Sequence, residues 1–200
     1  MEEPKLVIPI GGIQYGQNRD TLVQMSLPSN GADFLKVTLN YGPNLVLSTS
    51  ITLKELGPRN ANYLQSQINR GYHIEGLRTA LKSSAHLKEG LQIVKNTLKE
   101  LRSSPVAGTD PLTKLLIKEN MQSEDENEGQ VMKVFEKQEW FDKWGKHYIP
   151  SLLRAHYLQV CTNFKDPGLQ SYGGKLFQSL QNDIDTVFIK LPAPEPTIKK

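Results

Sequence analysis

Residues 141–174 bring together the side chains of this chain that could do nucleophilic chemistry. The stretch contains the only cysteine, Cys161, and two of the four histidines, His147 and His156. A cysteine nucleophile needs an imidazole within hydrogen-bond distance of its thiol. Because His156 lies five residues before Cys161, about 140° away around a helix, the two side chains point apart. We therefore predict that Cys161 is a buried structural residue.

The histidines and carboxylates of the region match no known metal-binding or catalytic pattern. His147 and His156 are nine residues apart across Pro150, and no HExxH pairing is present. The chain also lacks GxSxG, P-loop and dinucleotide-binding motifs. No recognisable acid/base pair is formed by the aspartates of this part of the chain, which are Asp142, Asp166, Asp183 and Asp185. We predict structural histidines, no enzymatic activity, no cofactor and no metal site.

Basic and aromatic residues intermingle in the same stretch, as they do on some RNA-binding surfaces. They are Lys143, Trp144, Lys146, Tyr148, Arg154 and Tyr157. The aromatic residues follow helical spacing, however, and a helical core needs them. The net charge is only +3, with scattered basic residues, so we predict that the chain does not bind nucleic acid.

The composition is that of a globular chain, with 38% hydrophobic and 22% charged residues. The start, MEEPKLVIPIGG, is acidic where a signal peptide is basic. No run approaches the roughly 18 apolar residues of a membrane span. One cysteine excludes an internal disulfide. We expect a cytoplasmic or nuclear protein that does not contact membranes.

The first 56 residues alternate between apolar and polar side chains, which is typical of β-strands. Strands are expected within 5–17, 20–28, 33–42 and 44–53, joined as an antiparallel meander. Such a small sheet is marginal alone, so its apolar face should lean on strands that this chain lacks. This candidate interface comprises Leu35, Val37, Leu39, Tyr41, Leu45, Leu47 and Ile51.

Residues 58–121 carry helical patterns. One helix is expected with an apolar seam of Leu64, Ile68, Tyr72, Leu77 and Leu81, and a second with a seam of Leu87, Leu91, Val94, Leu98 and Leu101. The simpler interpretation is that the two helices form a helical hairpin in a bundle. The alternative is that the second helix binds a partner. A third helix begins near Pro111, capped by Thr109 or Asp110.

From Val131 a wide apolar surface predicts the most buried helices of the chain. We expect Trp144 and Tyr148 to be among the most buried side chains, and a kink or a new helix at Pro150. Asp166-Pro167-Gly168 suits a type II turn. A last helix follows within 174–191. The fold class is thus α+β: a small antiparallel β-sheet or partial sandwich (1–56), a helical bundle (57–191) and a proline-rich tail (192–200).

The amino-acid sequence of the second half resembles that of a known family. The similarity is carried by "WGKHYIPSLLRAHYLQVCTNFKDPGLQSYGG" and by the later segment "DTVFIKLPAPEP". It is to the Vwaint region, also called VWA–Hint-associated, which follows the von Willebrand factor A (VWA) domain in multidomain intracellular proteins. "GGIQYGQNRDTLVQMSLP" resembles the strand segment that joins the two. The structural signature comprises Trp144, Gly145, His147, Tyr148, His156, Asn163, Phe164, Asp166, Pro167, Gly168, Tyr172, Gly173 and Gly174.

The resemblance implies a non-catalytic interaction and scaffolding module that supports a VWA domain and contacts other proteins. The alternative is the non-catalytic part of a RING-type ubiquitin ligase, because some plant relatives carry a RING finger. The DxSxS metal motif of a VWA domain and the cysteines of a RING finger are absent from this sequence. No catalytic residue is therefore implied for this chain.

Overall fold

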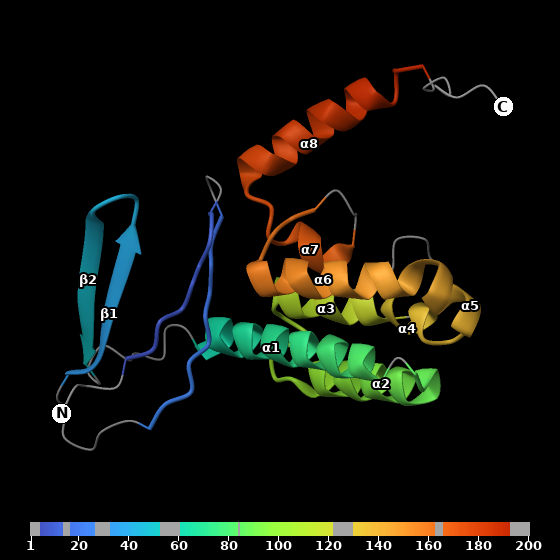
Figure 1. Cartoon of the computed structure of the whole chain (residues 1–200), viewed down its shortest axis with the longest axis horizontal. Helices are drawn as coiled ribbons and strands as arrows, with labels where there is room; N and C mark the ends of the chain where they lie inside the picture. Colours follow the sequence, from blue (N-terminus) through green and yellow to red (C-terminus); the bar gives the residue numbers. More distant parts are fainter. Residues whose placement is uncertain are drawn as a thin grey trace.

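The computed structural model describes residues 5–13, 17–26, 33–52, 61–83, 85–121, 130–162 and 166–192. In these ranges a two-stranded sheet precedes a body of helices, which confirms the α+β prediction (Figure 1). The elements are β1 (Asp33–Tyr41), β2 (Leu45–Thr52), α1 (Ala61–Lys82), α2 (Leu87–Ser103), α3 (Pro111–Asn120), α4 (Val131–Val134), α5 (Gln138–Trp140), the π-helical turn η3 (Phe141–Gly145), α6 (Lys146–Leu158), α7 (Pro167–Gln170) and α8 (Lys175–Phe188).

β1 and β2 form an antiparallel hairpin that stands beside the helical body (Figure 1). Leu39 pairs with Leu47 and Tyr41 with Leu45, so the residues of the candidate interface share one face. Leu35 and Ile51, at the open end, are half-buried. The rest of that face is exposed, with Leu47 at 58%.

The strands expected within 5–17 and 20–28 are absent from the described residues of those ranges, so that prediction is wrong. Alternation of apolar and polar side chains does not predict the structure of this segment, because side chains of the helical body bind it. Asp20 is bonded to α1 and to the end of α6 instead of to a neighbouring strand.

The helical pair predicted for 58–104 is confirmed as α1 and α2. The two helices approach closely at Gly76, where an added Cβ would lie 2.2 Å from Thr97 Oγ1 of α2. The predicted seam of α1 is wrong in part, because Leu64 and Tyr72 face outward. The inward face of α1 is mainly polar, with Ser66, Gln67, Asn69, Arg70 and His73 all buried.

α3 begins as the sequence predicts, with Pro111 in its first turn. Of the two candidate caps, Asp110 is the one used, since its Oδ2 accepts a hydrogen bond from the Thr113 amide at 2.6 Å. A second, buried bond joins the start of α3 to α1, where Asn69 Nδ2 donates to Thr113 Oγ1 at 3.0 Å. α3 is thereby fixed against α1 at its N-terminal end.

The apolar core lies between α1, α2, α4, η3, α6 and α7. Its most buried members include Phe135, Leu77, Ile149 and Leu152. Trp144 and Tyr148 are only half-buried and pack against the edge of this core, so the prediction that they rank among the most buried side chains is wrong. The backbone forms a wider π-helical turn at Phe141–Gly145. The side chains around it therefore point in other directions than regular α-helical spacing predicts.

Pro150 lies inside α6, and the change of helix type precedes it at Gly145 rather than beginning at Pro150. α8 confirms the last predicted helix, and it projects away from the body (Figure 1). None of its residues is buried. Among the described helices, none combines the length and apolarity that a membrane span requires.

Candidate functional site

Two histidines and a glutamate from three helices meet inside the helical body. His73 of α1 and His156 of α6 each direct Nε2 at Oε2 of Glu119 in α3, at 2.9 and 2.5 Å. The two imidazoles meet edge to face, with ring centroids 4.6 Å apart. All three side chains are fully buried. The cluster therefore joins α1, α3 and α6 through their side chains.

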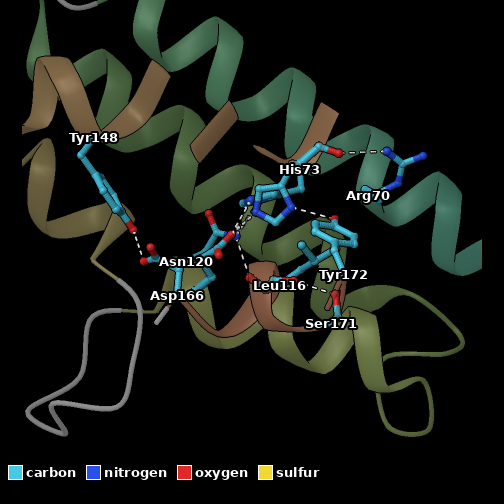
Figure 2. Close-up of polar contacts among 11 residues, drawn as sticks. Arg70, His73, Leu116, Asn120, Tyr148, Asp166, Ser171 and Tyr172 are labelled. Carbon is cyan, nitrogen blue, oxygen red and sulfur yellow. Dashed lines mark hydrogen bonds and ion pairs between the residues drawn. The ribbon is translucent and has the colours of Figure 1, made fainter. Parts of the chain in front are cut away.

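The tautomer of His73 follows from its second nitrogen. Asn120 Nδ2 lies 2.9 Å from His73 Nδ1 and also donates to the Leu116 carbonyl oxygen at 2.8 Å (Figure 2). The carbonyl accepts only, so this bond fixes the amide nitrogen of Asn120 as the donor to both. His73 Nδ1 is then an acceptor, and the proton of the neutral ring lies on Nε2. That proton is donated to Glu119.

The charges of the cluster compensate one another. Burial raises the pKa of the Glu119 carboxyl, but the positive charge of His156 and hydrogen bonds from both imidazoles lower it to about 2. Burial, and then the charge of His156, lower the pKa of His73. The site is thus a buried carboxylate that receives hydrogen bonds from two imidazoles, of which that of His73 is kept neutral by burial. His156 Nδ1 lies 2.8 Å from the Tyr172 hydroxyl, whose pKa is raised by burial.

Gly168 closes the cluster from the side of α7. A Cβ added there would lie 2.8 Å from His156 Cε1 and 2.9 Å from Glu119 Oε1, and neither buried side chain has room to move. Glu119 Oε1 is buried and has no hydrogen-bond donor among the described residues. The glycine is therefore required for close packing rather than for a left-handed turn.

The same three residues are the ligand set that a metal would use. Their ligand atoms lie within 4.8 Å of one another, and two histidines with a carboxylate suit zinc. A metal-binding imidazole, however, needs a bare Nε2 and donates its other N–H to an acceptor. Asn120 presents a donor to His73 Nδ1, which is the opposite arrangement. The residues do not fit a metal without a turn of the Asn120 amide, so we interpret the cluster as hydrogen-bonded.

The Asp166-Pro167-Gly168 stretch begins a helix instead of forming the expected type II turn. Pro167 is the first residue of α7, where its missing N–H costs nothing. The Asp166 carboxylate accepts a bond from the Tyr148 hydroxyl at 2.6 Å (Figure 2). Burial raises the pKa of both Asp166 and Tyr148. This contact ties α6 to the start of α7 beside the buried cluster.

The remaining residues considered for chemistry do not gather at one place. Cys161 is buried, and its thiol lies 3.8 Å from Gln170 Oε1; burial raises its pKa. His147 and Asp142 are exposed on the surface. Asp166, His156 and Cys161 each have separate partners in the described structure. Asn163 and Phe164 of the structural signature lie outside the described residues.

A second polar network fixes the N-terminal segment to the helical body. Asp20 accepts bonds from the Tyr63 hydroxyl at 2.6 Å and from Gln159 Nε2 at 2.7 Å, and its amide donates to Gln159 Oε1. Arg70 Nη2 donates to the Asp20 carbonyl at 2.9 Å, and Nη1 to the His156 carbonyl at 3.0 Å. Gln159 has φ 47°, a left-handed conformation that is uncommon without glycine and is held here by these contacts.

Comparison with known families gives one match, which lies in the second half of the chain. Residues 110–186 match the family described as Vwaint, VWA / Hh protein intein-like. The match confirms the predicted resemblance to a VWA-associated region over residues 110–186, which run from the cap of α3 into α8. No curated protein and no solved structure matches the chain.

The matched region contains Glu119 and His156, whereas His73 lies before it in α1. The hydrogen bonds of the buried carboxylate in the matched region are therefore completed by a helix outside the family match. Sequence reasoning singled out His156 but missed Glu119 and His73. The available signal was the unusual polarity of α1, whose apolar residues are too few to account for an inward face.

Proposed function

We propose that this chain is a non-catalytic interaction and scaffolding module, and that the apolar face of its β-hairpin docks a VWA domain. The observation that carries the proposal is the exposure of that face. Tyr41, Leu45 and Leu47 are between 45% and 58% exposed, on a sheet that has two strands in the described part of the chain. A two-stranded sheet is marginally stable in water and gains stability from further strands or a covering element.

The buried cluster supports a structural rather than catalytic role for the helical body. His73, Glu119 and His156 have no exposed surface, so in this conformation a substrate has no access to them. Their protons are committed to internal hydrogen bonds. A rigid helical body that carries an exposed hairpin suits presentation of a docking surface. The match to a VWA-associated region supports the choice of a VWA domain as the partner.

The test is calorimetric titration of the 200-residue chain against purified VWA domains from the same proteome. Leu47→Ser should weaken binding about tenfold or more, because it removes a central apolar side chain of the docking face. Val46→Ser is the matched control: Val46 is the neighbouring residue, is 61% exposed, and lies on the opposite face. Equal effects of the two substitutions, or no binding by any VWA domain, would contradict the proposal.

Ubiquitin ligation, the alternative that the resemblance implies, stays a prediction. It depends on a RING domain outside this chain, and a ubiquitin-transfer assay on the full-length gene product would test it.

A further inference from the structure

A pocket of about 370 Å³ lies between the N-terminal segment and the helical body. Residues 8–10 and 19–22 form one wall, and α1 and the end of α6 form the other. The segment packs directly on α1 here, since a Cβ added at Gly71 would lie 3.4 Å from Leu22 Cδ1. The hydrogen bonds of Asp20 hold the same segment in place. The pocket is therefore formed by parts of the chain that are distant in sequence and fixed to one another.

Arg19 lines this pocket with hydrogen-bond donors that are not used. Its Nη2 donates to the Gly12 carbonyl at 3.0 Å, but its Nε and Nη1 are buried and have no acceptor in the described structure. Arg70 is the contrast, because each of its three nitrogens donates to an oxygen 2.8 to 3.0 Å away. A buried cationic donor without an acceptor is costly. Because the Arg19 side chain as a whole is only half-buried, a small rotation of its outer bonds presents these donors to a ligand in the pocket.

The charges around the pocket are one negative charge short of balance. Three arginines line it, Arg19, Arg70 and Arg78, together with the carboxylate of Asp20. Arg78 forms an ion pair with a second carboxylate, that of Glu75. Three cations and two anions leave an excess of one positive charge. A ligand with a single carboxylate balances this excess, whereas a phosphate dianion exceeds it.

Much of the remaining pocket wall is aliphatic. These side chains come from both sides, with Ile8, Ile10 and Leu22 on the N-terminal segment and Ile74 and Leu158 on the helical body. An inorganic ion would leave this surface in contact with water, while an aliphatic group would cover it. Pockets for small ligands commonly combine such an apolar lining with a few polar groups that fix the orientation of the ligand.

We propose that the pocket binds an aliphatic monocarboxylate, with its carboxylate at Arg19 and its chain against the aliphatic wall. Two sources carry this chemistry: a free fatty acid and the C-terminal residue of a partner protein. None of the described lining residues belongs to β1 or β2, so the pocket is independent of the docking face proposed for the hairpin.

The smallest probe with both features is N-acetyl-leucine, and its matched control is N-acetyl-leucinamide, which keeps the side chain but has no charge. Each is titrated into the 15N-labelled 200-residue chain, and the amide chemical shifts are followed. N-acetyl-leucine should saturate the pocket with a Kd of about 1–10 mM and shift the amides of residues 19–22 and 70–78. The uncharged amide should bind at least about tenfold more weakly, since it cannot form a charge-assisted hydrogen bond with Arg19.

One pair of variants tests the assigned guanidinium. Arg19→Gln should weaken the binding of N-acetyl-leucine about tenfold or more, because it removes the positive charge at the carboxylate. Arg154→Gln is the control, with the same charge change at an exposed position of α6, and should leave the affinity unchanged. Unaltered amide shifts in α2 and α3 show that a variant keeps its fold. The comparison of acid and amide in the native chain holds even if Arg19→Gln is destabilised.

Two further probes distinguish the sources of the carboxylate. Octanoate represents a free fatty acid, and a six-residue peptide ending in leucine represents the C-terminus of a protein. The tighter of the two identifies the source, and either result agrees with the proposal. No saturation by N-acetyl-leucine up to about 20 mM, equal binding of its amide, or displacement by an equal concentration of inorganic phosphate would overturn it. Shifts confined to another surface, or full affinity in Arg19→Gln, would overturn it as well.

Discussion

In the helical body polar side chains are buried and bonded to one another, whereas in the hairpin apolar side chains lie in solvent. His73, Glu119 and His156 have no exposed surface, while Leu45 and Leu47 are more than half exposed. Burying a charge costs several kcal/mol unless partners compensate it, so the body depends on mutual pairing of its polar groups. The hairpin leaves its apolar face uncovered by the described residues. Buried polar pairing is thus concentrated in one region and exposed apolar surface in the other.

The largest expected effect is on the buried carboxylate. Glu119→Ala should lower the free energy of unfolding by about 3–5 kcal/mol, because it leaves two buried imidazoles without their acceptor. Urea denaturation followed by circular dichroism measures this change. Glu100→Ala, on the exposed face of α2, is the control and should change stability by less than about 0.5 kcal/mol.

The same preparation also tests the hydrogen-bonded interpretation of the cluster. If the native chain lost thermal stability when a chelator was added, the three residues would hold a metal. The argument from Asn120 to the protonated Nε2 of His73 would then be wrong.

The stability lost when an aromatic residue is replaced by alanine should depend on how deeply its side chain is buried rather than on its size. Phe135 is 1% exposed, and Phe135→Ala should cost about 3–5 kcal/mol. Trp144 is half-buried at the edge of the core, so Trp144→Ala should cost clearly less, although the side chain removed is larger. Chemical denaturation of both variants gives the comparison. A greater loss of stability from Trp144→Ala than from Phe135→Ala would contradict this ranking and support the sequence-based prediction that Trp144 is a main core residue.

Acid should weaken the body through the buried cluster. The lowered pKa of His73 keeps it neutral in the folded state, so below about pH 6.5 the unfolded chain binds a proton that the folded chain does not. The Glu119 carboxyl, with a pKa of about 2, stays charged when its unfolded counterpart protonates below about pH 4.5, and this adds up to about 3 kcal/mol of loss.

The raised pKa of Asp166 acts in the opposite sense, because its protonation on acidification relieves the cost of burying a carboxylate. Urea denaturation at pH values from 7 to 3 should show a net loss of stability. In the Glu119→Ala variant the loss below pH 4.5 should be smaller. An identical pH profile for the two proteins would show that the cluster does not carry the acid sensitivity.

The smallest effect is expected in the hairpin. Leu39→Ser should change the unfolding of the helical body by less than about 0.5 kcal/mol, because Leu39 is exposed and the hairpin contributes little to the core. Hydrogen exchange adds a second measurement, in which amides of β1 and β2 should exchange much faster than those of α1 and α6. Equal protection of the two regions would mean that the hairpin is stabilised by more than its own two strands.

The sequence by itself determined the parts of this fold that depend on local chemistry. Alternation specified β1 and β2 and placed Leu39 and Leu47 on one face, since side chains alternate along a strand. The Asp110 cap followed from an acceptor placed just before Pro111. The helical pair within 58–104 and the last helix within 174–191 followed from the spacing of apolar residues. These signals act over a few residues, so they can be recognised without the rest of the chain.

Tertiary structure alone decided the inward face of α1 and the buried cluster. Glu119 lies 46 residues from His73 and 37 from His156, and no local pattern connects residues so far apart. A polar side chain is ordinarily assigned to the surface because its desolvation is costly. Only when α1, α3 and α6 pack together do these groups compensate one another. Burial then becomes favourable for side chains that would each stay in water if they were alone. Hydrophobic periodicity therefore missed the polar part of the inward face of α1.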